Sequence, residues 1–496
     1  MHSSSMRYGA VLGVCFALGC GATKEHTGKL AGPPLTKGGH EAAAPLEIIT
    51  VGDVPPEVAS ITHRIWMQAA HVRKLKPTEP VKLAVLPGSE LVSVVKLHVK
   101  EEIPGETIRA EGRCFEALGL LPPKFDYEAE TYSLLEEELA GLYMPEDKTM
   151  YVARGIADDE LDATLSHELV HALQDQHFQI GKRMKYQPGA SDALGALQAL
   201  AEGDATSAMI DQVIYNKKGD AGLAEFTAAD LPDRDPEEFL AESLKDKKKD
   251  AKIRTAPRFI SLGLIAPYAD GMAFVNGLRR RGGWAAVDAA WAKPPVTSEQ
   301  LMHLEKYDAN EPAIAVSVAT ASALGAAWKA TFDDGFGEEE GRIAFGEWMG
   351  LDASKRAAKG WGGDHVTLFE ADGGKKAVVW RVVYDDEKEA NEAGSLLVSG
   401  WTVSFGAAQK IADVQVWGAP QQPKSKEPEK KSDKPKKGEP PPLPQLPDAP
   451  GSTPTPKPVA MVGCRALRVA GKAVTMIAGA PCDQIGAWEA EVGKAP

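Results

Sequence analysis

The chain has 496 residues, and 56 Lys and Arg stand against 70 Asp and Glu, which gives a formal net charge of −14 at pH 7. This balance argues against a nucleic-acid-binding protein, because neutralising phosphates requires a net basic face. Hydrophobic residues make up 43% of the chain, which is ordinary for a globular protein. Five cysteines are too few for a disulfide scaffold, and no apolar run approaches the ~20 residues that span a bilayer.

The N-terminus predicts export. Arg7 precedes a short apolar run that ends in small residues around Cys20, which is the order of a signal peptide. The segment Ala17-Leu18-Gly19-Cys20 resembles the lipobox of bacterial lipoproteins, in which the cysteine is lipidated and becomes the mature N-terminus. We expect residues 1–20 to be a lipoprotein-type signal peptide that places the protein in the cell envelope, anchored to a membrane and facing the periplasm or the exterior. Simple secretion is the alternative.

A flexible tether, rich in Gly, Ala and Pro, is predicted for residues 21–50, and a mainly helical domain for residues 51–310. Residues 141–147 indicate a strand end and a turn, and residues 149–153 a short strand. Residues 217–257 are charged and are expected to be a solvated insertion. Apolar spacing predicts helices over residues 55–72, 89–100, 107–118, 127–139, 158–177, 191–216 and 259–281, the last interrupted at Pro267 and ended by Gly282-Gly283.

A smaller α+β C-terminal domain is predicted from residues 311–418 and completed by strands in residues 460–496. Its clearest signal is a hairpin turn at Asp372-Gly373-Gly374 between two β-type runs. The Pro- and Lys-rich residues 419–459 cannot build a core and are expected to form a disordered linker, with binding of a protein partner as the alternative.

The remaining cysteines carry structural expectations. Cys464 and Cys482 flank a predicted hairpin, and the sequence does not decide whether they form a disulfide or stay as two free thiols. Cys114 lies on an apolar helical face and is predicted to be a buried free thiol. Trp361, within the segment Gly360 to Asp364, is expected to pack into the core from a turn.

The segment His167-Glu168-Leu169-Val170-His171 carries the chemistry. Its spacing puts both histidines on one helix face, where their imidazoles can reach one Zn²⁺. Glu168 lies about 100° round the helix, where its carboxylate can take the proton of a zinc-bound water whose pKa is lowered to about 7. A core helix with satisfied histidines is the alternative, but unpaired buried His and Glu would be costly.

A catalytic zinc needs a third protein ligand and an open position. Glu202, on the next predicted helix, sits among apolar and small residues, where a carboxylate is costly unless it is paired or binds a metal. A solvent-facing glutamate is the alternative. Gly203 in mid-helix indicates close packing against a neighbouring element.

His-Glu-x-x-His followed one helix later by Glu resembles the gluzincin pattern of zinc metallopeptidases. The chain also resembles a bacterial family of exported zincin-like proteins over about residues 54–385. The resemblance implies an α+β fold whose predominantly helical zincin-like domain contains a small edge-stranded sheet. It also implies Zn²⁺ held by His167, His171 and Glu202. The matching pieces are Gly141-Leu142-Tyr143, residues 167–178, Glu202-Gly203-Asp204, Pro267-Tyr268-x-x-Gly271-x-x-Phe274, Pro294-Pro295-x-Thr297-Ser298-Glu299-Gln300-x-x-His303 and Gly360-Trp361-Gly362-Gly363-Asp364.

The resemblance implies two further roles. In gluzincins a His or Tyr downstream of the glutamate ligand donates a hydrogen bond to the oxyanion. His303 is the candidate for this second catalytic residue, with Tyr268 and Tyr307 as competitors. Residues 149–153 would be the edge strand that pairs with an extended peptide.

The partners that orient the ligand histidines stay open. Gluzincins of the thermolysin type usually carry an Asp four residues after the glutamate ligand, and here that place is Thr206. Asp175 and Asp204 are both candidates for the orienting group.

We therefore expect an exported, lipid-anchored zinc metallopeptidase that acts on a peptide or protein substrate and uses Glu168 as general base. The alternative is a non-enzymatic envelope lipoprotein with an assembly or binding role on a zincin scaffold. The intact Glu168 favours the enzyme, because a structural zinc site needs no general base.

Overall fold

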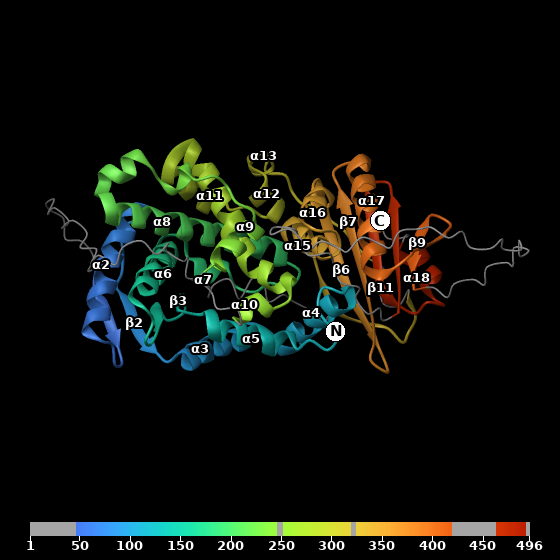
Figure 1. Ribbon diagram of the computed structural model, residues 1–496, viewed down its shortest axis with the longest axis horizontal. Coiled ribbons are helices and arrows are strands. Elements are labelled where there is room, and N and C mark those ends of the chain that lie inside the picture. The colour runs from blue at the N-terminus through green and yellow to red at the C-terminus, as the bar shows by residue number, and fades with distance from the viewer. Residues whose placement is uncertain (1–45, 246–250, 319–323, 419–462, 493–496) are drawn as a thin grey trace, which may run out of the picture.

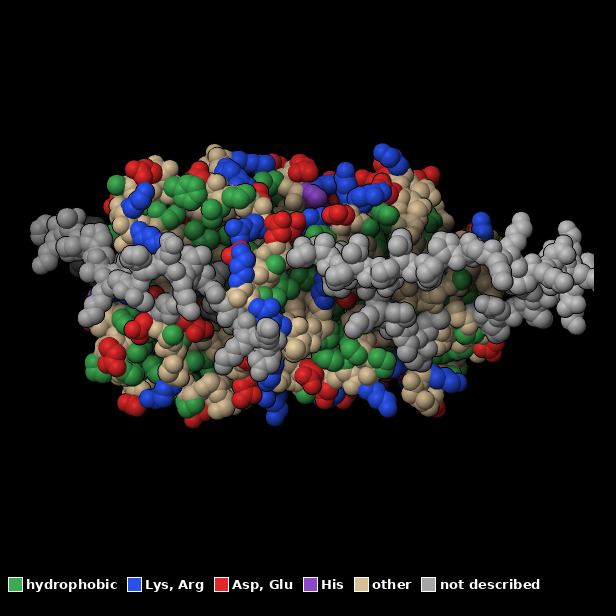
Figure 2. All heavy atoms as spheres, viewed as in Figure 1, with side chains coloured by type: hydrophobic (Ala, Val, Ile, Leu, Met, Phe, Trp, Pro, Cys, Tyr) green, Lys and Arg blue, Asp and Glu red, His purple; other side chains and the backbone are tan. Residues whose placement is uncertain are grey.

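The computed structural model describes residues 46–245, 251–318, 324–418 and 463–492 (Figure 1). The predicted signal peptide with Cys20, nearly all of the tether and the Pro- and Lys-rich linker lie outside the described residues. On the face shown in Figure 2, acidic and basic side chains of the described residues are interspersed.

The described chain is α+β, as predicted, with helices around a four-stranded sheet at one end and a seven-stranded sheet at the other (Figure 1). The first sheet contains β1 (Ile48–Val51), β2 (Val81–Leu86), β3 (Gly141–Met144) and β4 (Thr149–Ala153). The helices of this half are α2 (Pro56–Arg73), α3 (Gly88–Glu102), α4 (Gly105–Leu118), α5 (Tyr127–Glu138), α6 (Asp158–Phe178), α7 (Ile180–Arg183), α8 (Ser191–Glu225), α9 (Pro236–Ser243), α10 (Lys252–Thr255), α11 (Arg258–Ala292), α12 (Ser298–Met302) and α13 (Leu304–Ala309), with a 3-10 turn at Ala228–Asp230.

The second half is built on one antiparallel sheet in the order β5-β6-β7-β11-β10-β9-β8. The predicted hairpin joins β6 to β7, and the strands on either side of the linker lie in the same sheet. The elements are β5 (Lys329–Asp334), α15 (Gly337–Met349), α16 (Leu351–Ala358), β6 (Trp361–Ala371), β7 (Lys375–Tyr384), α17 (Glu387–Phe405), β8 (Gln409–Ile411), β9 (Val414–Trp417), β10 (Cys464–Ala470), β11 (Ala473–Ala480) and α18 (Ile485–Val492).

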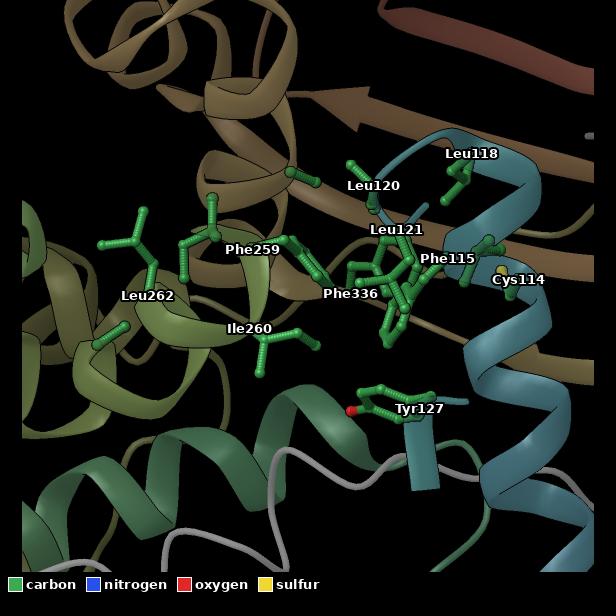
Figure 3. Packing of buried hydrophobic residues seen from close by; sticks show 14 of the residues in the cluster. Cys114, Phe115, Leu118, Leu120, Leu121, Tyr127, Phe259, Ile260, Leu262 and Phe336 are labelled. Carbon is green, nitrogen blue, oxygen red and sulfur yellow. The ribbon is translucent and has the colours of Figure 1, made fainter. Parts of the chain in front are cut away.

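One hydrophobic core joins the two halves. Leu135 of α5 and Ile265 of α11 belong to the same buried cluster as Trp380 of β7 and Met476 of β11. The predicted boundary near residue 310 therefore marks a change of secondary structure within a shared core. Figure 3 shows part of this cluster, where Phe115 of α4 and Phe259 of α11 approach Phe336.

The four-stranded sheet has the order β1-β2-β4-β3, which corrects the prediction for residues 149–153. Strand β4 is internal, because β2, which the sequence pattern did not reveal, pairs with it in parallel on the side away from β3. The edge strand is β3, antiparallel to β4, with Tyr143 opposite Met150.

Helices α8 and α11 meet at two glycines. A Cβ added to Gly203 would collide with the backbone of Gly271, and one added to Gly271 would collide with the carbonyl of Ala199. The close packing expected from a glycine in mid-helix is confirmed. It brings the backbone of α11 against the segment of α8 that carries Glu202.

Helix α11 departs from prediction in three ways. Pro267 lies within it, and Gly282 and Gly283, the latter with φ of 62°, form a kink after which helix continues to Ala292. The helix is also long and apolar enough to cross a membrane, contrary to the expectation, although 83% of its most apolar window is buried inside the protein. Its packing against α8 and the shared core accounts for that apolar character.

The remaining predictions concern a charged segment, a tryptophan and the cysteines. The solvated insertion predicted for residues 217–257 instead contains the end of α8 and two short helices. Trp361 is buried as predicted but begins strand β6. Cys464 and Cys482 form a disulfide, and Cys114 is a buried free thiol.

Candidate metal centre

Helices α6 and α8 bring together three side chains that can act as metal ligands. One donor atom from each of His167, His171 and Glu202 lies within 4.8 Å of the other two.

 The centre consists of two histidines and one glutamate, and within the described residues no lysine or arginine forms an ion pair with Glu202. All three side chains are buried, with exposed fractions of 3%, 5% and 1%. The structure therefore brings together the three residues that the sequence analysis proposed as ligands.

The distances between the donor atoms suit one small cation. The Nε2 atom of His167 lies 3.0 Å from Oε2 of Glu202 and 3.1 Å from Nε2 of His171, and the third side of the triangle is 3.5 Å. Tetrahedral ligands about 2.0–2.1 Å from Zn²⁺ stand about 3.3–3.4 Å apart. The spacing of these three atoms therefore fits the binding of one Zn²⁺, which His167, His171 and Glu202 would hold.

Gln174 fixes the orientation of His171. The amide nitrogen of Gln174 donates to the carbonyl of Ala201, 3.0 Å away, so its oxygen faces Nδ1 of His171 at 2.8 Å. Because an amide oxygen only accepts, Nδ1 carries the proton, and in its neutral form His171 presents the lone pair of Nε2 to the other two donors. That is the tautomer a metal ligand needs.

The orienting residue is thus Gln174, which the sequence reasoning passed over. Asp175 instead accepts from the Tyr143 hydroxyl and the amide of Gly181, at 3.3 and 3.2 Å. Asp204 is buried with Arg73 and accepts from the indole of Trp291. The sequence signal that could have indicated this role is the three-residue spacing from His171 to Gln174, which puts both side chains on one helix face.

Burial and charge oppose each other at the centre. Burial lowers the pKa of His167, and a hydrogen bond to Glu202 only partly offsets it. Burial would also lower the pKa of His171, but the carboxylate of Glu202 outweighs it and raises that pKa to about 9. Burial would raise the pKa of Glu202, but the neighbouring histidines hold it below its usual value. A charged Glu202 therefore needs positive charge beside it.

Glu168 stands next to the centre on the edge-strand side. The backbone amide of Tyr143 in β3 donates to its Oε2 atom at 2.8 Å, and the side chain is 1% exposed. Burial raises the pKa of this carboxyl to about 8. A cation between the histidines would favour the carboxylate, which is the form that can accept a proton.

The three candidates for the oxyanion donor are placed differently. The ring of Tyr268 lies 5.7 Å from the ring of His167. His303 instead contacts Glu338 through Nε2, at 2.9 Å, and the hydroxyl of Tyr307 donates to the carbonyl of Lys293. The structure therefore brings Tyr268 to the metal centre, and the contacts of His303 lie with α15.

A second group of metal-type donors has a different character. Carboxylate atoms of Glu299, Glu311 and Asp385 also lie within 4.8 Å of one another. The ammonium of Lys306 sits among them, at 3.1, 2.5 and 2.6 Å. This cluster therefore already contains a cation that belongs to the chain itself.

Comparison with known proteins adds one match. A family described as "Domain of unknown function (DUF8575)" matches residues 319–427, which lie outside the helices that carry the metal centre. No curated protein and no solved structure matches the chain.

Proposed function

We propose that this protein is a zinc metallopeptidase of zincin type, exported and lipid-anchored through Cys20. The observation that carries the proposal is the buried triangle of donor atoms from His167, His171 and Glu202, with the Glu168 carboxylate beside it. When bound, Zn²⁺ would polarise a peptide carbonyl and supply a nucleophile near neutral pH.

The chain's own residues would perform the remaining steps. The Tyr143 amide that holds Glu168 belongs to the outer edge of β3, so an extended peptide pairing with that edge would run past Glu168. Glu168 would accept the proton of the attacking water and pass it to the leaving amine. We assign stabilisation of the oxyanion to Tyr268 in preference to His303, because the Tyr268 ring lies against His167.

The test replaces Glu168 by Gln, which keeps the shape and removes the basic carboxylate. Bound zinc and folding should match the parent, while hydrolysis of an unstructured protein should fall by ~10²–10⁴-fold. Zinc content by atomic absorption and rate are measured on the same preparations. Full activity with zinc bound would contradict the mechanism.

Tyr268→Phe and His303→Ala separate the oxyanion candidates. Loss of one oxyanion donor costs about 10²–10³-fold in kcat, so we expect that loss in Tyr268→Phe and a smaller one in His303→Ala. Both variants should keep their zinc. The reverse order would return the role to His303.

A second candidate function rests on burial. A catalytic zinc keeps an open position, whereas the donors here are at most 5% exposed and every residue of β3 is buried. This favours a structural zinc in a non-enzymatic envelope lipoprotein. A parent protein that binds zinc but hydrolyses none of several unfolded substrates would support this second candidate.

The anchor is tested independently of the centre. A lipid on Cys20 is the membrane attachment that we propose, so Cys20→Ser should move the protein from the membrane to the soluble fraction. A substituted protein that still sediments with membranes would contradict it.

A further inference from the structure

A cavity opens between α8 and α11 on the N-terminal side of the place where the two helices touch. The helices meet at Gly203 and Gly271, and the cavity is lined by residues that precede both glycines, within 191–198 and 259–267. Residues of α4, α5 and α15 complete its walls.

The inner end of this cavity adjoins the metal centre. Gln198, which lines the cavity, stands one helical turn before Glu202 on the same face of α8. One such turn rises about 5–6 Å. On α11, the lining residue Pro267 directly precedes Tyr268, whose ring lies against His167.

The charged groups that line the cavity are all acidic. They come from three helices, and among the described lining residues none is a lysine, arginine or histidine. The acids are Glu111 of α4, Asp192 of α8, and Glu339 and Glu340 of α15.

Between these acids the wall is apolar and largely aromatic. The ring of Phe115 packs edge-on against Phe259, with their centroids 4.7 Å apart, and the rings of Tyr127 and Phe336 lie 5.5 and 5.9 Å from the Phe115 ring (Figure 3). Such a wall accepts a long aliphatic chain, while the acids accept a positive charge at its end.

Glu339 is the acid whose environment points to a missing cation. Its Oε1 atom is buried and has no hydrogen-bond partner in the described chain. Burial and the neighbouring Asp270 raise the pKa of Glu339 well above its ordinary value, and Arg342, which is paired with Asp270, offsets this only in part. A cation in the cavity would supply the missing partner.

We propose that this cavity binds a lysine or arginine side chain of the peptide substrate, with its stem against the aromatic wall and its cationic end at Glu339 and Glu340. The proposal rests on the peptidase function proposed above, and it gives that function a substrate class.

The test compares peptides that differ at one position near the scissile bond, with lysine in one and norleucine in the other, since norleucine has a similar stem and no charge. We expect kcat/KM to favour the lysine peptide by at least tenfold. Glu339→Gln and Glu340→Gln should each reduce that ratio severalfold. Glu347→Gln, which removes a carboxylate from the same helix α15 outside the cavity lining, should leave it unchanged.

Binding of the same labelled peptides to zinc-loaded Glu168→Gln protein, followed by fluorescence anisotropy, separates the two proposals. Hydrolysis without a preference between the peptides, or with a preference for norleucine, would overturn the cavity assignment and leave the peptidase standing. Preferential binding of lysine peptides without hydrolysis by the parent would support the cavity and overturn the peptidase. Neither binding nor hydrolysis would overturn both.

Discussion

Among the described residues there are two groups of three metal-type donors, and they differ in whether a lysine lies among them. Around Lys306, the carboxylates of Glu299, Glu311 and Asp385 already surround an ammonium of the chain. At the metal centre, no lysine or arginine pairs with Glu202, and its partners are two histidines that can act as metal ligands when neutral. Donor spacing alone does not distinguish these groups, and the presence of a lysine ammonium does.

The largest effect is expected from removing the two histidines of the metal centre. In the double variant His167→Ala, His171→Ala, bound zinc should fall from one equivalent to near zero, and peptidase activity should fall by ~10³-fold or more, because several kcal/mol of transition-state stabilisation are lost. Glu311→Gln, in the other cluster, should keep its zinc. Stoichiometric zinc in the double variant would sink the assignment.

Removing the Lys306 ammonium should leave the carboxylates of Glu299, Glu311 and Asp385 without a cation among them. Lys306→Ala leaves Glu299, 2% exposed, without its ammonium partner. We expect a loss of about 2–3 kcal/mol in the free energy of unfolding, below the ~3–5 kcal/mol of a fully buried pair, because Glu311 and Asp385 are partly exposed.

Millimolar Ca²⁺ should recover part of that loss in urea unfolding, since carboxylate oxygens suit this ion, and it should leave the parent unchanged. An equal effect of Ca²⁺ on parent and variant would show that Lys306 does not fill the place of a cation.

The orientation of His171 offers a smaller effect. Gln174→Ala removes the acceptor that fixes the His171 tautomer, and loss of such a partner typically weakens metal affinity by ~10–100-fold. Competition with a chromogenic zinc chelator measures the change. Asp175→Asn is the matched control and should bind zinc like the parent, so weakening in the control alone would return the orienting role to Asp175.

The smallest effect is the pH dependence of the Lys306 cluster. Burial, opposed by Lys306, raises the pKa of Glu299 to about 7, whereas an unfolded chain has a value of about 4.3. Between these values the folded protein holds the extra proton, so stability falls as pH rises. From about pH 5.5 to about pH 7 the contribution of Glu299 should fall by about 1.5 kcal/mol.

Glu299→Gln has no proton to lose, so urea unfolding at the two pH values should show a correspondingly smaller fall in the variant. Parallel falls in parent and variant would place the titrating group elsewhere.

Local sequence patterns predicted much of the helical half. Apolar periodicity and turn chemistry gave α2 to α6 nearly to the residue, because each signal lies within one element. Local patterns did not predict strands β1 and β2 or the order of the sheet, because pairing between segments that are distant in sequence leaves no local pattern. That is why residues 149–153 proved to be internal and β3 the edge.

The same division holds at the site. By itself, the sequence determined the chemistry of the donors, because the spacing of His167 and His171 follows from the helix and a carboxylate at Glu202 among apolar residues demands a cation. Which other side chains lie beside these donors depends on the tertiary structure. The close contact of Gly203 with Gly271 places Tyr268 near His167, and the fold carries His303 to Glu338. Lys306 contacts three carboxylates that are distant in sequence or on another element. Such contacts depend on packing between elements, which residue spacing does not encode.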